Sequence, residues 1–164
     1  MNVRFVPTTR DNWREAMQLQ VHEEQSPYVA SVVVSLAKVH IRPDGDQYDY
    51  APFNIYNAED RLIGFIMTAV DDTTTWSYWL TGFIIDTMEQ GKGYGKAALQ
   101  AAIDHIRTQF PQSQRVNLTA HADNTRARRL YEKFGFTATG EVYDGEVVYR
   151  YELNPPDRDA KISM

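Results

Sequence analysis

The spacing of apolar residues along the chain predicts an alternation of strands and helices. Short apolar runs between polar or turn residues predict strands, and apolar residues that recur every three or four positions predict helices. The predicted order is a strand, two helices, three strands, a helix, a strand, a helix and two strands. The expected strands are 3–6, 53–56, 62–67, a run that ends at residue 86, 116–120, 136–142 and 147–153.

Residues with capping or helix-stopping chemistry indicate where the helices begin and end. The first helix is expected to run to about Val21, with Trp13 and Met17 on its inner face. The expected boundary residues are Asp11 before the first helix, Ser26 and Pro27 at the start of the second, Pro111 after the third, and Asn124 and Gly135 around the fourth.

This order of elements predicts a mixed α/β fold with helices on both faces of one sheet. The 164 residues suit one domain, expected at 1–153, which is long enough to bury a core. A polar C-terminal tail is expected at 154–164, where two prolines precede mixed charges. The Asp144-Gly145 turn signal indicates that the last two strands form a hairpin.

Three glycines at alternate positions, Gly91, Gly93 and Gly95, separate the strand that ends at Asp86 from the third helix. This arrangement favours phosphate binding, because backbone N–H groups can approach an anion and the helix start adds unpaired donors. The spacing fits neither the dinucleotide fingerprint nor the Walker loop, which needs a hydroxyl residue after Lys96. The alternative is a glycine-rich helix entry that binds no ligand.

Two motifs resemble those of the GNAT superfamily of N-acetyltransferases. The first is Gln-x-x-Gly-x-Gly at 90–95, and the second is Asn…Ala-x-x-Leu-Tyr-x-x-x-Gly-Phe at 124–136. Two motifs in this order form a specific signal. The resemblance implies the GNAT fold, a mostly antiparallel sheet of about seven strands with four helices on both faces, and acetyl-CoA as cosubstrate without a metal.

The resemblance also implies roles for individual residues. Amides of the central strand would pair with the pantetheine arm and polarise the thioester, Asn124 would contact the cofactor, and Tyr131 would protonate the departing thiolate. The alternatives are a core-facing Tyr131 and a plain helix cap at Asn124. The strand amides would come from Phe83, Ile84 and Ile85, and the pyrophosphate site from Gln90, Gly91, Lys92, Gly93, Tyr94, Gly95 and Lys96.

Within the superfamily, 24–25, 64–67 and 90–96 are most similar to bacterial diamine and spermine/spermidine acetyltransferases. Those proteins usually carry Asp-Arg where this chain has Thr81-Gly82, so the proton acceptor expected from the family is missing. Glu23 or Glu24, which we also expect to bind the substrate, or a chain of waters would replace it. The alternatives are another acceptor, such as a protein N-terminus, a lysine, an aminoglycoside or an amino acid, or a CoA-binding regulatory module without catalysis.

Composition narrows the chemistry. Cysteine is absent, which excludes a cysteine nucleophile, a thiolate metal site and disulfides, and favours direct attack of the amine in a ternary complex. The four histidines have no metal-ligand spacing. No apolar run approaches the roughly 20 residues of a membrane span and no signal peptide is recognisable, so we expect a cytoplasmic protein without a membrane partner.

The distribution of charge agrees with an anionic cofactor and a cationic acceptor. The net charge of -5 argues against a nucleic-acid partner. Residues 86–133 carry eight Lys and Arg against five acids, and the remainder carries nine against 17. Such a division suits a small-molecule amine, although solvated faces that merely differ in sign would give the same count. A homodimer is expected from the family resemblance alone.

Overall fold

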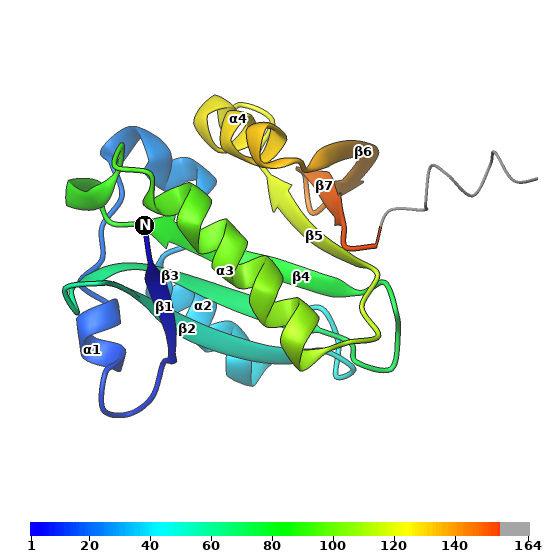
Figure 1. Ribbon diagram of the computed structural model, residues 1–164, viewed down its shortest axis with the longest axis horizontal. Coiled ribbons are helices and arrows are strands. Elements are labelled where there is room, and N and C mark those ends of the chain that lie inside the picture. The colour runs from blue at the N-terminus through cyan, green and yellow to red at the C-terminus, as the bar shows by residue number, and fades with distance from the viewer. Residues whose placement is uncertain (155–164) are drawn as a thin grey trace, which may run out of the picture.

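The computed structural model describes residues 1–154, which form a seven-stranded sheet with helices on both faces (Figure 1). The sheet order is β1-β2-β3-β4-β5-β7-β6, and all neighbouring strands are antiparallel except β4 and β5. The expected mixed, mostly antiparallel α/β fold is confirmed. The strands are β1 (Val3–Pro7), β2 (Asp49–Asn57), β3 (Leu62–Val70), β4 (Tyr78–Ile85), β5 (Arg115–Ala120), β6 (Thr137–Tyr143) and β7 (Glu146–Glu152).

Two helices cover each face of the sheet. The α-helices are α1 (Trp13–Ala16), α2 (Val32–Ile41), α3 (Tyr94–Gln109) and α4 (Thr125–Phe134), and the 3-10 helices are η1 (Glu23–Tyr28) and η2 (Thr87–Glu89). Buried residues of α3 and α4 join one core cluster, and those of α1 and α2 join the other. Strand β3 contributes to both clusters, because successive side chains of a strand point to opposite faces. None of the described helices is long and apolar enough to cross a membrane.

The first predicted helix is much shorter than expected. It comprises Trp13–Ala16 rather than running to about Val21, and its N-cap is Asn12 rather than Asp11. The chain after α1 turns toward the start of η2, where the Gln20 N–H donates to Asp86 Oδ1 (2.9 Å) and the Thr87 N–H donates to the Gln20 carbonyl (2.7 Å). These long-range hydrogen bonds satisfy backbone groups that a longer helix would have paired. The chain therefore leaves the helix early, although its apolar residues continue at helical spacing.

The second helix begins later than predicted. Ser26 and Pro27 lie inside η1, and α2 begins after Ser31, whose Oγ accepts a hydrogen bond from the Val34 N–H (3.3 Å). Proline cannot donate a backbone hydrogen bond, which suits the short 3-10 turn that occupies this position. The other predicted elements are confirmed with shifted ends, and residues 155–164 of the expected tail lie outside the described part of the chain.

The sheet opens between β4 and β5. These strands pair in parallel at Trp79 opposite Asn117, and beyond that position their residues line cavities. A β-bulge in β4 lies at the same place, because the register shifts between 65 and 67 of β3 and Gly82 adopts a φ of +61°. Bulges re-aim the residues around them, so the end of β4 is free to present its main chain to a ligand.

Candidate active site

Two cavities lie in the opening between β4 and β5. We call the first, about 280 Å³, the glycine-turn cavity, because the end of β4, the glycine turn and the start of α4 line it. The second, about 350 Å³, is the hairpin cavity, lined by β4, β5, the loop before β2 and the β6–β7 hairpin. The two cavities share Val29, Phe83, Asn124 and Tyr131, so they meet at these side chains.

The glycine-turn cavity collects nearly all of the residues predicted to bind the cofactor. Lys92 does not line it, because its ammonium pairs with Glu89 (3.1 Å). The predicted residues that do line it are Phe83, Ile84, Ile85, Gln90, Gly91, Gly93, Tyr94, Gly95, Lys96, Asn124 and Tyr131. Their cofactor contacts stay predictions, and the structure supplies one concave site in which they can be made together.

The glycine turn has the geometry that an anion site requires. Gly91 and Gly93 have φ values of +76° and +90°, a region that glycine occupies without strain. A Cβ at Gly91 would meet no described atom within 4 Å, so its main chain faces open space. Gly93 is the N-cap of α3, a helix of 16 residues, whose first N–H groups have no partners within the helix. A diphosphate therefore fits at this turn.

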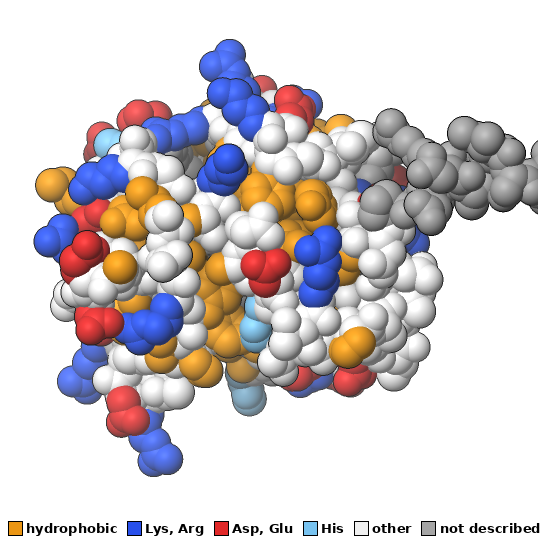
Figure 2. Space-filling model, viewed as in Figure 1, with side chains coloured by type: hydrophobic (Ala, Val, Ile, Leu, Met, Phe, Trp, Pro, Cys, Tyr) orange, Lys and Arg blue, Asp and Glu red, His pale blue; other side chains and the backbone are white. Residues whose placement is uncertain are grey.

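Basic residues extend the site toward α4. Lys96 and Arg126 line the glycine-turn cavity. Figure 2 shows Lys and Arg side chains gathered over α4 at the top of this face. An anionic ligand therefore meets a positive surface beside the helix N-terminus.

Two amide side chains hold the turn against η1. The Gln90 Nε2 donates to the Ile85 carbonyl and to Gln25 Oε1, both at 2.9 Å, and the Gln25 Nε2 donates back to Gln90 Oε1 at 3.1 Å. The motif glutamine thus has a structural partner on a segment 65 residues away. These contacts fix the main chain between β4 and α3.

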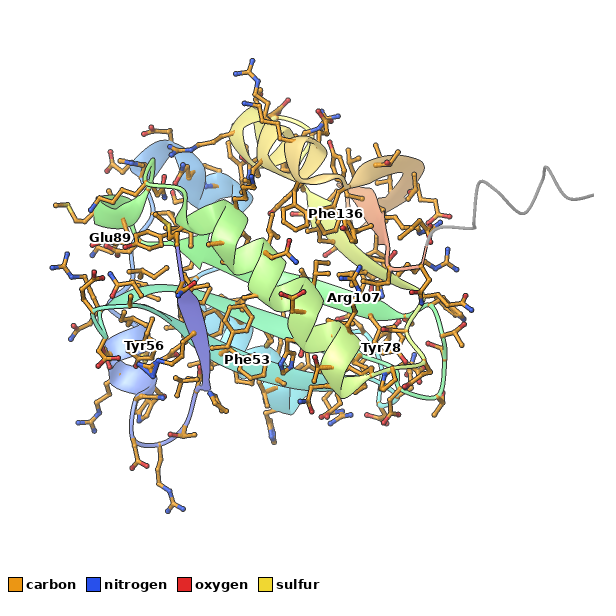
Figure 3. All side chains as sticks on the ribbon, in the orientation of Figure 1. Phe53, Tyr56, Tyr78, Glu89, Arg107 and Phe136 are labelled. Carbon is orange, nitrogen blue, oxygen red and sulfur yellow. The ribbon has the colours of Figure 1, made fainter. Side chains whose placement is uncertain are left out.

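Glu89 anchors the turn from the other side. Its side chain is buried, and Figure 3 shows it at the turn that precedes α3. Glu89 Oε1 accepts from Arg61 Nη1 (3.0 Å), and Oε2 accepts from Lys92 Nζ (3.1 Å). Donation by Arg61, with a further contribution from Lys92, lowers the pKa of this carboxyl below its ordinary value. The carboxylate is therefore charged and ties the turn to the β2–β3 connection.

Tyr131 lies where the two cavities meet. It is 7% exposed, and the rings of Phe136 and Tyr149 lie 6.0 Å from its own. Burial raises the pKa of its phenol, and the charge of Glu146 raises the pKa further. The phenol is therefore protonated at neutral pH. Tyr131 is thus both a core residue and a cavity residue.

Asn124 caps α4 and lines both cavities. Its Oδ1 accepts a hydrogen bond from the Ala127 N–H (3.3 Å), so the predicted cap is confirmed. The residue is 9% exposed, and the part that remains accessible faces the cavities. A structural cap and a ligand contact are therefore compatible at this position.

The hairpin cavity has an acidic and aromatic lining. Its carboxylates are Asp44, Asp144 and Glu146, and Lys38 is its one basic residue among those described. The aromatic residues are Tyr28, Tyr48, Tyr50, Trp79, Phe83, Tyr131 and Tyr143. Sequence reasoning missed these acids, because Asp144 is recognisable only as a turn residue and the others lie in no motif.

The predicted substrate acids are not in this cavity. Glu23 and Glu24 are exposed on η1 and line neither cavity. Thr81 and Gly82, which replace the acid and arginine expected from the family resemblance, do line the hairpin cavity. No group of three or more potential metal ligands occurs among residues 1–154.

Comparison with known proteins agrees with this geometry. The model of the acetyltransferase (GNAT) family matches residues 13–136. A spermine/spermidine N(1)-acetyltransferase of Bacillus subtilis is 33% identical, over 93% of this chain and the full length of that protein. A mycothiol acetyltransferase of Mycolicibacterium vanbaalenii is 32% identical over 71% of this chain but only 38% of its own length.

Solved structures share the fold. A spermidine N-acetyltransferase from Vibrio cholerae, in complex with CoA and spermine, superposes with a TM-score of 0.66 at 18% identity, covering 90% of this chain and 92% of the other. An aminoglycoside acetyltransferase in complex with coenzyme A gives a TM-score of 0.70 at 16% identity, covering 93% and 95%. The family match, the full-length relative and the fold agree with the two sequence motifs. The chain belongs to the acetyltransferase (GNAT) family.

Proposed function

We propose that this protein transfers the acetyl group of acetyl-CoA to a primary amine of a polyamine, by direct attack in a ternary complex. The observation that carries the proposal is the meeting of two cavities at Tyr131. One has a glycine turn and a helix start suited to a diphosphate, and the other has an acidic and aromatic lining suited to a cationic amine.

Groups of the chain would bind the cosubstrate and donate the proton that the departing thiolate needs. Main-chain N–H groups of the glycine turn would bind the diphosphate, and those of Phe83, Ile84 and Ile85 would orient the pantetheine arm. The bound cosubstrate supplies an activated acyl group. Tyr131, which lines both cavities, would give its proton to the sulfur that leaves. The chain contains no cysteine, in agreement with direct attack rather than an acyl-enzyme.

Charge and relationship support a polyamine as the acceptor. Three carboxylates and one lysine line the hairpin cavity, which favours a ligand with several positive charges. Aromatic rings in the same lining can cover the apolar stretches between those charges. The relative that matches over its full length is a spermine/spermidine acetyltransferase. Glu23 and Glu24 stay in the proposal as exposed acids that would attract the substrate before it enters.

An acceptor panel tests the proposal. Purified protein is mixed with acetyl-CoA and spermidine, spermine, putrescine, butylamine, an aminoglycoside or an N-terminal peptide, and thiol release is followed. We expect the two polyamines to give the highest kcat/KM and butylamine, which has one charge, a far lower one. Preference for the aminoglycoside or the peptide would refute the polyamine acceptor, and CoA binding without thiol release for any amine would indicate a regulatory module.

Three broader expectations belong to the same proposal. We propose a single domain over 1–153, a cytoplasmic location and a homodimer. A spermidine N-acetyltransferase with the same fold is described as a dodecamer, so assemblies occur among its structural neighbours. Light scattering of the purified protein is expected to give the mass of two chains of 18.9 kDa, and the mass of one chain would refute the dimer.

A further inference from the structure

Glu146 lies where β4 and β5 have separated. It is the first residue of β7, is half-buried and lines the hairpin cavity. Thr119 of β5 fixes its orientation, because the Thr119 hydroxyl donates to Glu146 Oε2 at 2.5 Å. The carboxylate is thus held by one hydrogen bond from the strand that borders the opening.

Glu146 and Tyr131 line the same cavity, and their charges interact. The charge of Glu146 is the second cause, after burial, of the raised pKa of the Tyr131 phenol. Within residues 1–154, no Lys, Arg or His nitrogen lies within 4.0 Å of the Glu146 carboxylate. A half-buried carboxylate that has no cationic partner nearby stabilises a cation that enters the cavity.

The other acids of the cavity are placed differently. Asp44 accepts hydrogen bonds from the Tyr143 hydroxyl (2.5 Å) and from the Tyr50 hydroxyl, so both of its oxygens are engaged. Asp144 is exposed at the hairpin turn. Lys38, the basic residue of the lining, forms no ion pair with a described carboxylate within 4.0 Å. Glu146 is therefore the acid best placed to act beside Tyr131.

We propose that Glu146 binds the ammonium of the acceptor and accepts a proton from it. Thr81 of β4, at the position where related enzymes carry an acid, cannot accept this proton. This inference rests on the proposed acetyl transfer. Glu146 takes a proton from the ammonium, and the freed lone pair forms the N–C bond at the thioester carbon. The C–S bond breaks, and the sulfur leaves with the electron pair and receives the Tyr131 proton.

The remaining protons balance. The second proton of the attacking nitrogen returns to the Tyr131 oxygen, and Glu146 releases its proton to solvent. The net change is one proton released for each amide formed. Asp44 and Asp144 would attract the distal charges of a long acceptor, because they lie in the same lining and, of the three acids, only Glu146 acts through its charge on the Tyr131 phenol.

Glu146→Gln tests the inference, because glutamine keeps the shape and an oxygen for Thr119 but removes the charge. We expect kcat/KM for spermidine to fall about 100-fold or more, with the KM for acetyl-CoA unchanged within about twofold. Glu141→Gln is the matched control, since Glu141 is exposed on the same hairpin and lies outside the cavity lining. It is expected to keep wild-type kinetics.

A less basic amine separates proton transfer from simple anchoring. An acceptor that is largely neutral at the assay pH has no ammonium proton for Glu146 to remove before attack, so Glu146→Gln is expected to lower its kcat/KM much less than that of spermidine. Equal losses for both amines, or kinetics equal to those of Glu141→Gln, would overturn the inference while leaving the acetyl transfer intact. Absence of transfer by the wild-type protein would instead overturn the proposed function itself.

Discussion

Gly82 is the position in β4 at which a side chain should be most disruptive. It lies in the β-bulge with a φ of +61°, in the left-handed region. A Cβ at this position would lie 2.4 Å from Ser35 Oγ and 3.2 Å from Ser35 Cβ, because α2 passes directly over the bulge. Gly82→Ala is therefore expected to destabilise the protein through the backbone and through a clash.

The two contributions can be estimated separately. An L-residue in the left-handed region costs about 1–2 kcal/mol, and forcing extra atoms into a packed site costs about 1–3 kcal/mol more. We expect the free energy of unfolding to fall by about 2–5 kcal/mol in total. That is a large part of the about 5–15 kcal/mol typical of a domain, and it corresponds to a Tm lowered by roughly 10 °C.

Urea unfolding followed by tryptophan fluorescence measures the loss. Gly140→Ala is the matched control, since Gly140 has a φ of +84° and a Cβ there would meet no described atom within 4 Å. It should lose only the backbone contribution of about 1–2 kcal/mol. Adding Ser35→Ala to Gly82→Ala should restore part of the lost free energy of unfolding, because it removes the Ser35 hydroxyl from the clash. Equal losses in the two glycine variants, or no recovery in the double variant, would refute this account of the bulge.

Three further substitutions probe the site and its support. Tyr131→Phe is expected to lower kcat about 100-fold or more and to leave CoA affinity, measured by calorimetry, within about twofold of wild type. His105→Gln is expected to flatten the loss of Tm between pH 7.5 and pH 5. Burial lowers the His105 pKa below its ordinary value of 6.5, so the unfolded chain protonates first and the folded state loses stability as the pH falls through that value. Glu89→Gln is expected to lower both the Tm and CoA affinity, because Arg61 and Lys92 lose the charge that holds the glycine turn.

Residues of the same types away from these positions provide the controls. These are Tyr56→Phe for the phenol, His40→Gln for the imidazole and Glu59→Gln for the carboxylate. Tyr56 lies outside both cavities, and His40 and Glu59 are exposed. Wild-type kcat in Tyr131→Phe, an unchanged pH dependence in His105→Gln, or wild-type CoA affinity in Glu89→Gln would each contradict the corresponding role.

Elements with a strong local signal could be predicted from the sequence. The apolar spacing of α3 and the Asn124 and Gly135 boundaries of α4 all lie within a few residues of the helices that they define. The two N-terminal helices were predicted, but the end of the first was not, because the chain after α1 is held by hydrogen bonds of Gln20 with Asp86 and Thr87, more than 60 residues away. Likewise, Asp144-Gly145 predicted a hairpin but not that β7, rather than β6, would pair with β5.

The candidate site also has parts that local sequence motifs predict and parts that they do not. The glycine turn and Tyr131 belong to contiguous motifs and were found as such. The hairpin cavity could not be predicted, because its lining residues come together only through the fold. For example, the Tyr143 hydroxyl donates a hydrogen bond to Asp44, which lies 99 positions away in the sequence. Lys92 has the motif position of a phosphate ligand, yet its ammonium is engaged by a buried carboxylate that no local pattern reveals.

The central claim is that main-chain amides of the glycine turn bind the diphosphate of coenzyme A in the cavity that ends at Tyr131. Titration calorimetry with CoA and with pantetheine, which has the same thiol arm but lacks the diphosphate and the 3′-phosphoadenosine joined to it, tests it most directly. We expect one CoA per chain and pantetheine binding weaker by about 100-fold, as the loss of one or two hydrogen bonds to a charged group would give. No heat with CoA, or equal affinities for the two ligands, would contradict the account.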